Sequence, residues 1–270
     1  MSSVAPKVGQ IPASAASRSV GDGVGGESLF LRAHNPVLSI ALHLLPGLLT
    51  LAVYLLLRQP VQRAGYPSLV ALNLAILLAL VPYVLGVLAY LGYRRNGRLS
   101  LAGVVLYRER ISPLKYLIYV ALGFGASLIL IAFILDKFIS PVVQTAFFGW
   151  VPTVNWGLNG GYGKPVMVVS YVLVAVVTNI CEPTVEELYF RGFLLPRMRY
   201  AGRWTVLVHS TLNAMYHLWY PWRIVTLAIG MTPLIYAVRR TRNIYVGLAI
   251  HLLLNSFYLI FGVAYILGMS

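Results

Sequence analysis

Two adjacent carboxylates, Glu186 and Glu187, lie within an apolar segment that is long enough to cross a membrane. The chain has only seven acidic residues, and a carboxylate inside the hydrocarbon region of a bilayer is costly. Acidic residues in such positions are therefore retained mainly where they bind or react. The pair predicts a functional site, and the alternative is a structural ion pair with one solvated glutamate at the membrane surface.

Arg191 follows Glu187 by four residues, which puts the two on one face of a helix in the favoured acid-before-base order. We expect Arg191 to neutralise Glu187. Glu186 is rotated by about 100° from its neighbour and has no obvious partner on the same helix. A desolvated carboxylate without a cation suits a general base near neutral pH. Pro183, just upstream, is expected to kink or restart the helix.

A second polar set comprises His209, Asn213 and His217, spaced four and four in the next apolar segment. This spacing predicts one stripe along a helix. The alternative role for each is hydrogen bonding between membrane helices, which is the commoner use of a single intramembrane histidine.

The last apolar segment contains His251 and Asn255, again four residues apart and therefore on one face. Both side chains can donate hydrogen bonds. Two converging donors in a pocket of low dielectric constant could stabilise a developing oxyanion. Simple helix packing is the alternative.

The composition is that of a membrane protein. Hydrophobic residues make up 59% of the 270 residues and charged residues only 10%, against roughly 25% charged in soluble domains. We predict an all-α, polytopic transmembrane helix bundle with a polar catalytic cavity in its C-terminal helices. Residues 1–35 are expected to form a disordered N-terminal tail and residues 36–270 one membrane domain.

The apolar runs predict about seven membrane spans, each near the roughly 20 residues that a bilayer requires. The expected spans are 37–57, 68–91, 116–135, 168–190, 204–221, 223–238 and 244–267. The sixth of these is the shortest.

The net charge of +14 comes from Lys and Arg residues that lie mainly between the apolar runs. This placement sets orientation in the membrane and contacts lipid phosphates, so nucleic acid is not an expected partner. Seven crossings put three basic clusters on one side, which the positive-inside rule makes the cytoplasm. The N-terminus and the opening of the active site are then predicted to be cytoplasmic. The three clusters are Arg94, Arg95, Arg98, Arg108, Arg110 and Lys115; Arg197, Arg199 and Arg203; and Arg239, Arg240 and Arg242.

Together these residues resemble the CPBP family of intramembrane proteases, which includes CAAX endopeptidases and Abi-type bacterial proteins. Its first motif, Glu-Glu-x-x-x-Arg, is matched by Glu186, Glu187 and Arg191. Its second, Phe-x-x-x-His, is matched at His217, with Asn213 in place of Phe, and its third, His-x-x-x-Asn, at His251 and Asn255. The resemblance covers about residues 165–260.

The resemblance implies hydrolysis of a peptide bond within the membrane, on a membrane-anchored or lipidated peptide or protein. It implies that Glu186 is the base, His217 its partner, and His251 with Asn255 the oxyanion site, while Glu187 and Arg191 are supporting residues. Members are often labelled metalloproteases. If this chain holds zinc, the expected ligands are Glu186, His217 and His251, although a metal-free glutamate mechanism is the favoured expectation. The Asn213 departure leaves open whether activity is retained.

Two other classes of function compete with the endopeptidase. One is a non-catalytic membrane protein of the immunity or chaperone-like kind that has kept the helices. Retention of costly polar residues argues against it, because loss of function should remove them first. The other is a proton-coupled transporter with an acidic and histidine relay, which the lack of visible internal repeats disfavours.

Overall fold

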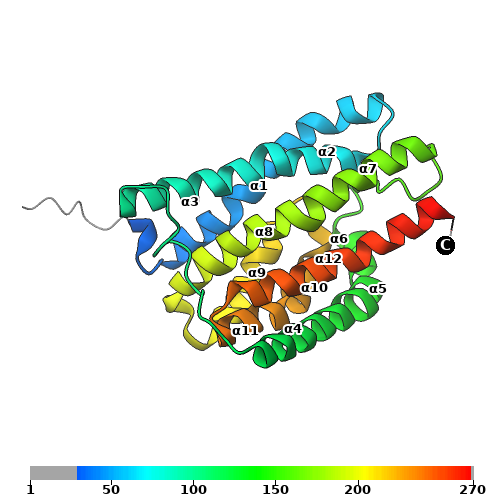
Figure 1. Cartoon of the computed structure of the whole chain (residues 1–270). Helices are drawn as coiled ribbons and strands as arrows, with labels where there is room; N and C mark the ends of the chain where they lie inside the picture. The colour runs from blue at the N-terminus through cyan, green and yellow to red at the C-terminus, as the bar shows by residue number, and fades with distance from the viewer. Residues whose placement is uncertain (1–28, 269–270) are drawn as a thin grey trace, which may run out of the picture.

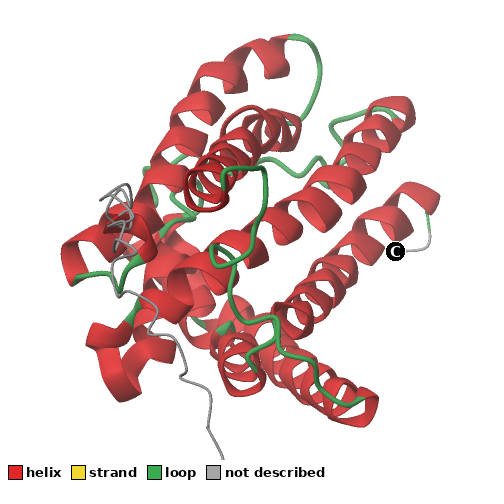
Figure 2. Ribbon diagram, turned by 60° about the vertical axis from the view of Figure 1, so that its left-hand side comes forward, coloured by secondary structure: helices red, strands yellow, loops and turns green. Residues whose placement is uncertain are grey.

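The structure, a computed structural model, describes residues 29–268. Figure 2 shows only helices and loops in this part of the chain, and no strand occurs within it. The predicted all-α membrane protein is therefore confirmed. Residues 1–28 of the expected tail lie outside the described residues. Beyond residue 28, the His34 backbone N–H donates to the Arg197 carbonyl at 2.9 Å, which ties the segment to the bundle.

Five helical stretches are long and apolar enough to cross a membrane, and they correspond to five of the predicted spans. A bent pair, Pro221–Gly230 with Thr232–Thr241, meets at 43° and provides a sixth candidate. The five stretches are Pro36–Arg63, Ser68–Asn96, Pro113–Phe147, Lys164–Arg197 and Ile244–Leu267.

The predicted count of seven spans is not confirmed, because the segment 204–221 forms too short a helix. Helix α9 covers only Thr205–Met215, which is 11 residues. At 1.5 Å per residue this is about 16 Å, roughly half the thickness of the hydrocarbon core. Pro221 follows, and it favours the extended backbone that Tyr220 adopts (φ −143°, ψ 69°) over continued helix.

Several of the long stretches change helix type along their length. Short π-helical segments interrupt them at Ile76–Leu80, Ile129–Leu135, Val177–Cys181 and Glu187–Leu194. The α-helices are α1 (Pro36–Arg63), α2 (Ser68–Ala75), α3 (Val81–Asn96), α4 (Pro113–Leu128), α5 (Asp136–Phe138), α6 (Ser140–Phe147), α7 (Lys164–Val176), α8 (Glu182–Glu186), α9 (Thr205–Met215), α10 (Ile224–Gly230), α11 (Thr232–Thr241) and α12 (Ile244–Leu267).

The α7–α8 stretch, which carries the acidic residues, runs through the middle of the bundle. In Figure 1 it lies between α2 and α3 on one side and α12 on the other, and the contacts agree: α7 packs on α2 and α12, while α8 packs on α3 and α12. Neighbouring helices therefore enclose the acidic residues on more than one side.

The three basic clusters lie together at one end of the bundle. Arg239 Nη2 donates to the Gly202 carbonyl at 3.0 Å, which joins the second and third clusters. Arg242 Nε lies 2.8 Å from Glu109 Oε1, which joins the third cluster to the loop of the first. This arrangement agrees with the expected grouping of positive charge on one side, while the assignment of that side to the cytoplasm stays a prediction.

Candidate active site

The stretch that carries the acidic residues changes helix type around them. A π-helical turn at Val177–Cys181 precedes α8, and a second π-helical segment at Glu187–Leu194 follows it. Pro183 lies in the first turn of α8 and cannot donate to the upstream ladder. The predicted break at Pro183 therefore takes the form of a change in helix type. Such π-helical turns within α-helices frequently occur at functional sites.

Arg191 is fully buried and faces both acidic residues. Its Nε lies 3.4 Å from Glu187 Oε1, as expected, and its Nη1 lies 3.7 Å from Glu186 Oε2. The expectation that Glu186 lacks a partner on its own helix is therefore wrong. In a π-helix the backbone hydrogen bonds join residues that are five apart. Glu186, five residues before Arg191, therefore lies on the same side of the helix as Glu187, four residues before it.

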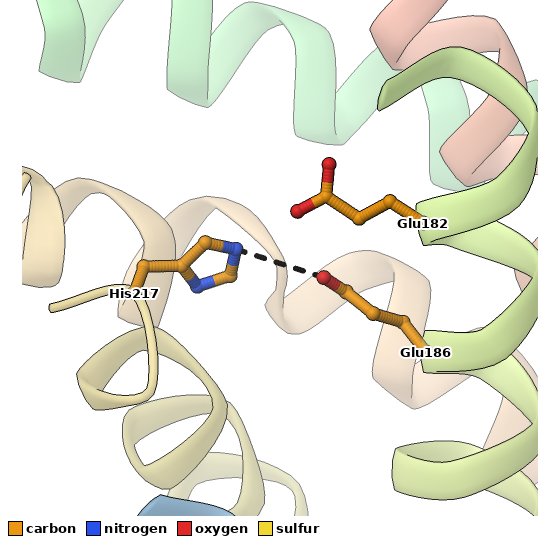
Figure 3. Close-up of side chains that lie close together, drawn as sticks. All are labelled: Glu182, Glu186 and His217. Carbon is orange, nitrogen blue, oxygen red and sulfur yellow. Dashed lines mark ion pairs between the residues drawn. The ribbon is translucent and has the colours of Figure 1, made fainter. Parts of the chain in front are cut away.

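Glu186 has two further neighbours that were not predicted from the sequence. Tyr216 Oη donates to Glu186 Oε1 at 2.5 Å. Glu182, one helical turn earlier, reaches into the same space, as Figure 3 shows. The spacing of four between Glu182 and Glu186 is a signal that could have revealed this neighbour. Tyr216 adjoins His217 in the sequence, but nothing there indicates that its hydroxyl turns to Glu186.

His217 lies in a turn beyond the end of α9 rather than on the helix itself. Its Nδ1 is 3.0 Å from the Asn213 carbonyl. A carbonyl oxygen can only accept a hydrogen bond, so His217 Nδ1 carries a proton. The other ring nitrogen, Nε2, faces the acidic cluster, which consists of Glu182, Glu186 and Glu187. Nε2 lies 3.8 Å from Glu186 Oε1. The structure thus brings these two predicted residues together from separate segments, as the dashed line in Figure 3 marks.

The predicted stripe of three polar residues on one helix does not form, because α9 ends at Met215. His209 is buried elsewhere, with its Nδ1 3.1 Å from Nε2 of His43 on α1. Asn213 is buried and lines the same cavity as His217. Only two of the three residues therefore belong to the candidate site.

Helix α12 brings His251 and Asn255 to this cavity. His251 Nδ1 lies 3.1 Å from Glu187 Oε1, and Asn255 Nδ2 donates to the Thr178 carbonyl at 2.8 Å. An amide nitrogen carries two hydrogens, so Asn255 keeps a second N–H to offer. One hydrogen-bonding contact each therefore holds His251 and Asn255 against the Lys164–Arg197 stretch, which carries the acidic residues.

A cavity of about 530 Å³ joins these side chains. Besides the acidic, imidazole and amide groups, its wall contains apolar side chains such as Ile131, Leu254 and Phe261. The wall also holds an ion pair in which Arg223 Nε lies 3.0 Å from Asp136 Oδ1 and Nη2 lies 2.5 Å from Oδ2. An apolar pocket with a few converging polar groups is the usual form of a ligand site.

The residues that converge as possible metal ligands differ from the expected zinc set. Among the described residues, the group whose ligand atoms lie within 4.8 Å of one another is Glu182, Glu186 and His217. Figure 3 shows both carboxylates reaching from one helix toward the imidazole. His251 is not in this group and faces Glu187 instead. Two carboxylates and one imidazole are donors that divalent transition metals accept.

Close approach of α12 to the acidic cluster depends on Gly247. A Cβ there would collide with the Glu187 carboxylate and lie 2.6 Å from Val238 Cγ2. We expect Gly247→Ala to destabilise the protein by about 1–3 kcal/mol, the usual cost of overpacking, in thermal unfolding in detergent. Gly86→Ala on α3 is the matched control, since its Cβ meets nothing within 4 Å. Equal melting temperatures for the two variants would contradict this packing.

The fold and the site define a polytopic helical membrane protein with a cavity lined by acidic, imidazole and apolar groups. The family profile described as type II CAAX prenyl endopeptidase Rce1-like matches residues 168–257, about a third of the chain. This match confirms the predicted resemblance to the CAAX/CPBP intramembrane proteases, a hydrolase family. No curated protein and no solved structure matches the chain significantly.

Proposed function

We propose that the protein is a CAAX-type intramembrane endopeptidase that hydrolyses a peptide bond in the cavity around Glu186. One observation carries the proposal: Glu186 and His217 face each other across 3.8 Å at the cavity, inside the region matched by a protease family. The same match does not favour the non-catalytic or transporter alternatives.

Glu186 and His217 are suited to holding the attacking water. Glu186 Oε1 and the unprotonated Nε2 of His217 are both acceptors, so one water can donate a hydrogen to each. Its oxygen lone pair then remains free to form the new bond to the carbonyl carbon. The proton that water loses passes to this pair and from there to the leaving amine, as general acid–base catalysis requires.

His251 and Asn255 are assigned to the oxyanion. His251 Nδ1 pairs with Glu187, so a protonated ring presents its Nε2–H to the cavity. Asn255 offers the amide N–H that Thr178 does not use. Preorganised donors of this kind stabilise the charge that develops on the carbonyl oxygen. In this assignment Glu187 and Arg191 hold the other groups in place.

The substrate class follows from the cavity wall and the family description. The apolar side chains suit a lipidated or apolar peptide tail, and the matched family is that of CAAX prenyl endopeptidases. The substrate is therefore proposed to be a membrane-anchored, prenylated peptide or protein that enters from the cytoplasmic side. Membrane lipids, which surround the helix bundle, are the other proposed partner of the protein.

The test uses purified protein in liposomes with two peptides that share one CAAX-type sequence, one farnesylated at its cysteine and one unmodified. We expect cleavage after the lipidated cysteine, detected by mass spectrometry, and slower or no cleavage of the unmodified peptide. Equal rates would contradict recognition of the lipid. No cleavage of either peptide by folded protein would contradict the endopeptidase itself.

Tyr216→Phe tests the contact between the phenol and the base. The variant removes the 2.5 Å hydrogen bond to Glu186 and leaves the ring in place. A hydrogen bond to a charged group is worth about 1.5–3 kcal/mol, so we expect kcat to fall roughly 10-fold or more with KM little changed. Tyr83→Phe is the control, because it removes a hydroxyl contact to Tyr189 only. Identical kinetics in both variants would contradict a role for Tyr216 at the site.

A further inference from the structure

We infer that Arg223 binds the free α-carboxylate at the C-terminus of the substrate peptide and thereby sets how far from that end the chain is cut. Among the described residues, Arg223 is the only lysine or arginine in the wall of the cavity, which Glu182 and Glu186 also line. An anionic group in this cavity is therefore attracted to Arg223 and repelled by the two glutamates. Arg223 belongs to none of the motifs that carry the family resemblance. The inference deepens the proposed function and rests on it for the peptide.

The guanidinium of Arg223 is held in place and keeps donors to spare. Its bidentate pair with Asp136 uses one N–H of Nε and one of Nη2, out of the five that a guanidinium carries. The Asp136 carboxylate also accepts from Ser140 Oγ at 3.0 Å and from Tyr258 Oη at 3.2 Å. Asp136 is thus stabilised by hydroxyl groups as well, and the arginine can share its charge with a second carboxylate.

The surroundings of Arg223 favour a carboxylate as its ligand. The side chain is 23% exposed, so it is accessible from the cavity. Its Cζ lies 5.5 Å from the ring centroid of Tyr220 and 5.9 Å from that of Tyr258. These rings keep water from part of the guanidinium, and electrostatic attraction is stronger where water is scarce. A planar guanidinium matches a carboxylate in both charge and geometry.

Tyr220 also relates Arg223 to the proposed reaction centre. The His217 ring stacks on Tyr220 with their centroids 5.5 Å apart, and the guanidinium carbon of Arg223 lies 5.5 Å from the same Tyr220 centroid. The centre of the His217 ring and the guanidinium carbon are therefore separated by at most about 11 Å. An extended peptide spans about 3.3–3.6 Å per residue, so a carboxylate bound at Arg223 leaves about three residues or fewer beyond the bond that is cut.

The direction along the bundle is consistent with this placement. Helix α12 begins at Ile244, next to the basic cluster that ends at Arg242. At 1.5 Å per residue, Tyr258 lies about 10 Å farther from that end of the helix than His251 does. Tyr258 is the residue of α12 that contacts the Arg223–Asp136 pair. A chain that enters from the basic end therefore passes the reaction centre before its C-terminus reaches Arg223.

The experiment uses two farnesylated peptides of one CAAX-type sequence, one ending in the α-carboxylate and the other in an α-carboxamide. With full-length protein in liposomes, we expect kcat/KM to be about 10- to 100-fold higher for the carboxylate, the factor that a hydrogen bond to a charged group contributes. Arg223→Gln is expected to lower cleavage of the carboxylate peptide to the rate of the carboxamide peptide, whose own rate changes little. A loss of folded protein would instead lower both rates by the same factor.

Two further variants separate recognition from folding. Asp136→Asn combined with Arg223→Gln removes both charges of the pair, so neither is left without its partner. We expect this double variant also to lose the preference for the carboxylate peptide. Asp136→Asn alone is the control that retains Arg223, and it is expected to keep the preference. An undiminished preference in folded Arg223→Gln overturns the carboxylate site.

Binding of the same peptides, carrying a fluorescent label, to Glu186→Gln in detergent separates this inference from proteolysis. That variant is expected to hold the peptides uncleaved. Tighter binding of the carboxylate peptide without cleavage by the wild type supports the carboxylate site and contradicts the peptidase. Equal affinities together with equal cleavage of the two peptides overturn the carboxylate site and keep the peptidase. Failure of both peptides to bind also overturns the site.

Discussion

Glu186→Gln is expected to lower kcat/KM for the lipidated peptide by roughly 1,000-fold, within the range that a positioned general base contributes. The amide keeps the size of the side chain and can still accept from Tyr216, but it cannot take a proton from water. The buried position of Glu186 beside His217 makes this the largest catalytic effect that we predict. Steady-state cleavage in liposomes measures it.

Glu109→Gln is the matched control for Glu186→Gln, because it makes the same chemical change at a carboxylate that is 54% exposed. We expect its kcat/KM to equal that of the wild type. Near-normal cleavage by folded Glu186→Gln would contradict the role of Glu186 as the general base and would leave its carboxylate with a structural role only.

Arg191→Met is expected to cause the largest loss of stability, about 3–5 kcal/mol in the free energy of unfolding. The variant keeps a long side chain but deletes the cation that faces Glu186 at 3.7 Å and Glu187 at 3.4 Å. Two carboxylates are then left together in a buried site. Denaturant or thermal unfolding in detergent measures the loss, and Glu187→Gln added to Arg191→Met should recover part of it.

Arg242→Met supplies the control for the loss of an arginine. This arginine pairs with Glu109 at 2.8 Å, but the two side chains are 62% and 54% exposed. Exposed ion pairs contribute about 0–1 kcal/mol, so the expected change is small. Equal destabilisation by the two arginine variants would show that burial at Arg191 is not what makes its charge important.

The sequence alone was sufficient for the membrane class and for four of the polar residues that meet at the cavity. Long uncharged runs predicted the five long helices because a bilayer admits few other structures. Glu186, His217, His251 and Asn255 were identified from residue type and spacing, and all four line one cavity in the structure. Their catalytic roles stay predictions.

The rest depended on geometry that an ideal helix does not have. With regular turns of 3.6 residues, Arg191 was predicted to pair with Glu187 alone. In the structure the π-helical segment lets the guanidinium face Glu186 as well. Apolar composition predicted a span where α9 is only a short helix, because hydropathy does not register the break before Pro221. Because the helix ends before His217, this residue does not lie on the expected stripe, and its side chain lies beside Glu182 and Glu186.

Cleavage of the farnesylated peptide by wild-type protein in liposomes made up in H₂¹⁸O shows whether this cavity hydrolyses a peptide bond. We expect two products: a peptide that ends in the lipidated cysteine, with one ¹⁸O in the new α-carboxylate of that cysteine, and the released C-terminal peptide with a new amino group and no ¹⁸O from cleavage. Glu186→Gln run in parallel should give neither product above background. An intact peptide after incubation with folded wild-type protein, or equal cleavage by Glu186→Gln, would contradict the assignment of this cavity as a proteolytic site.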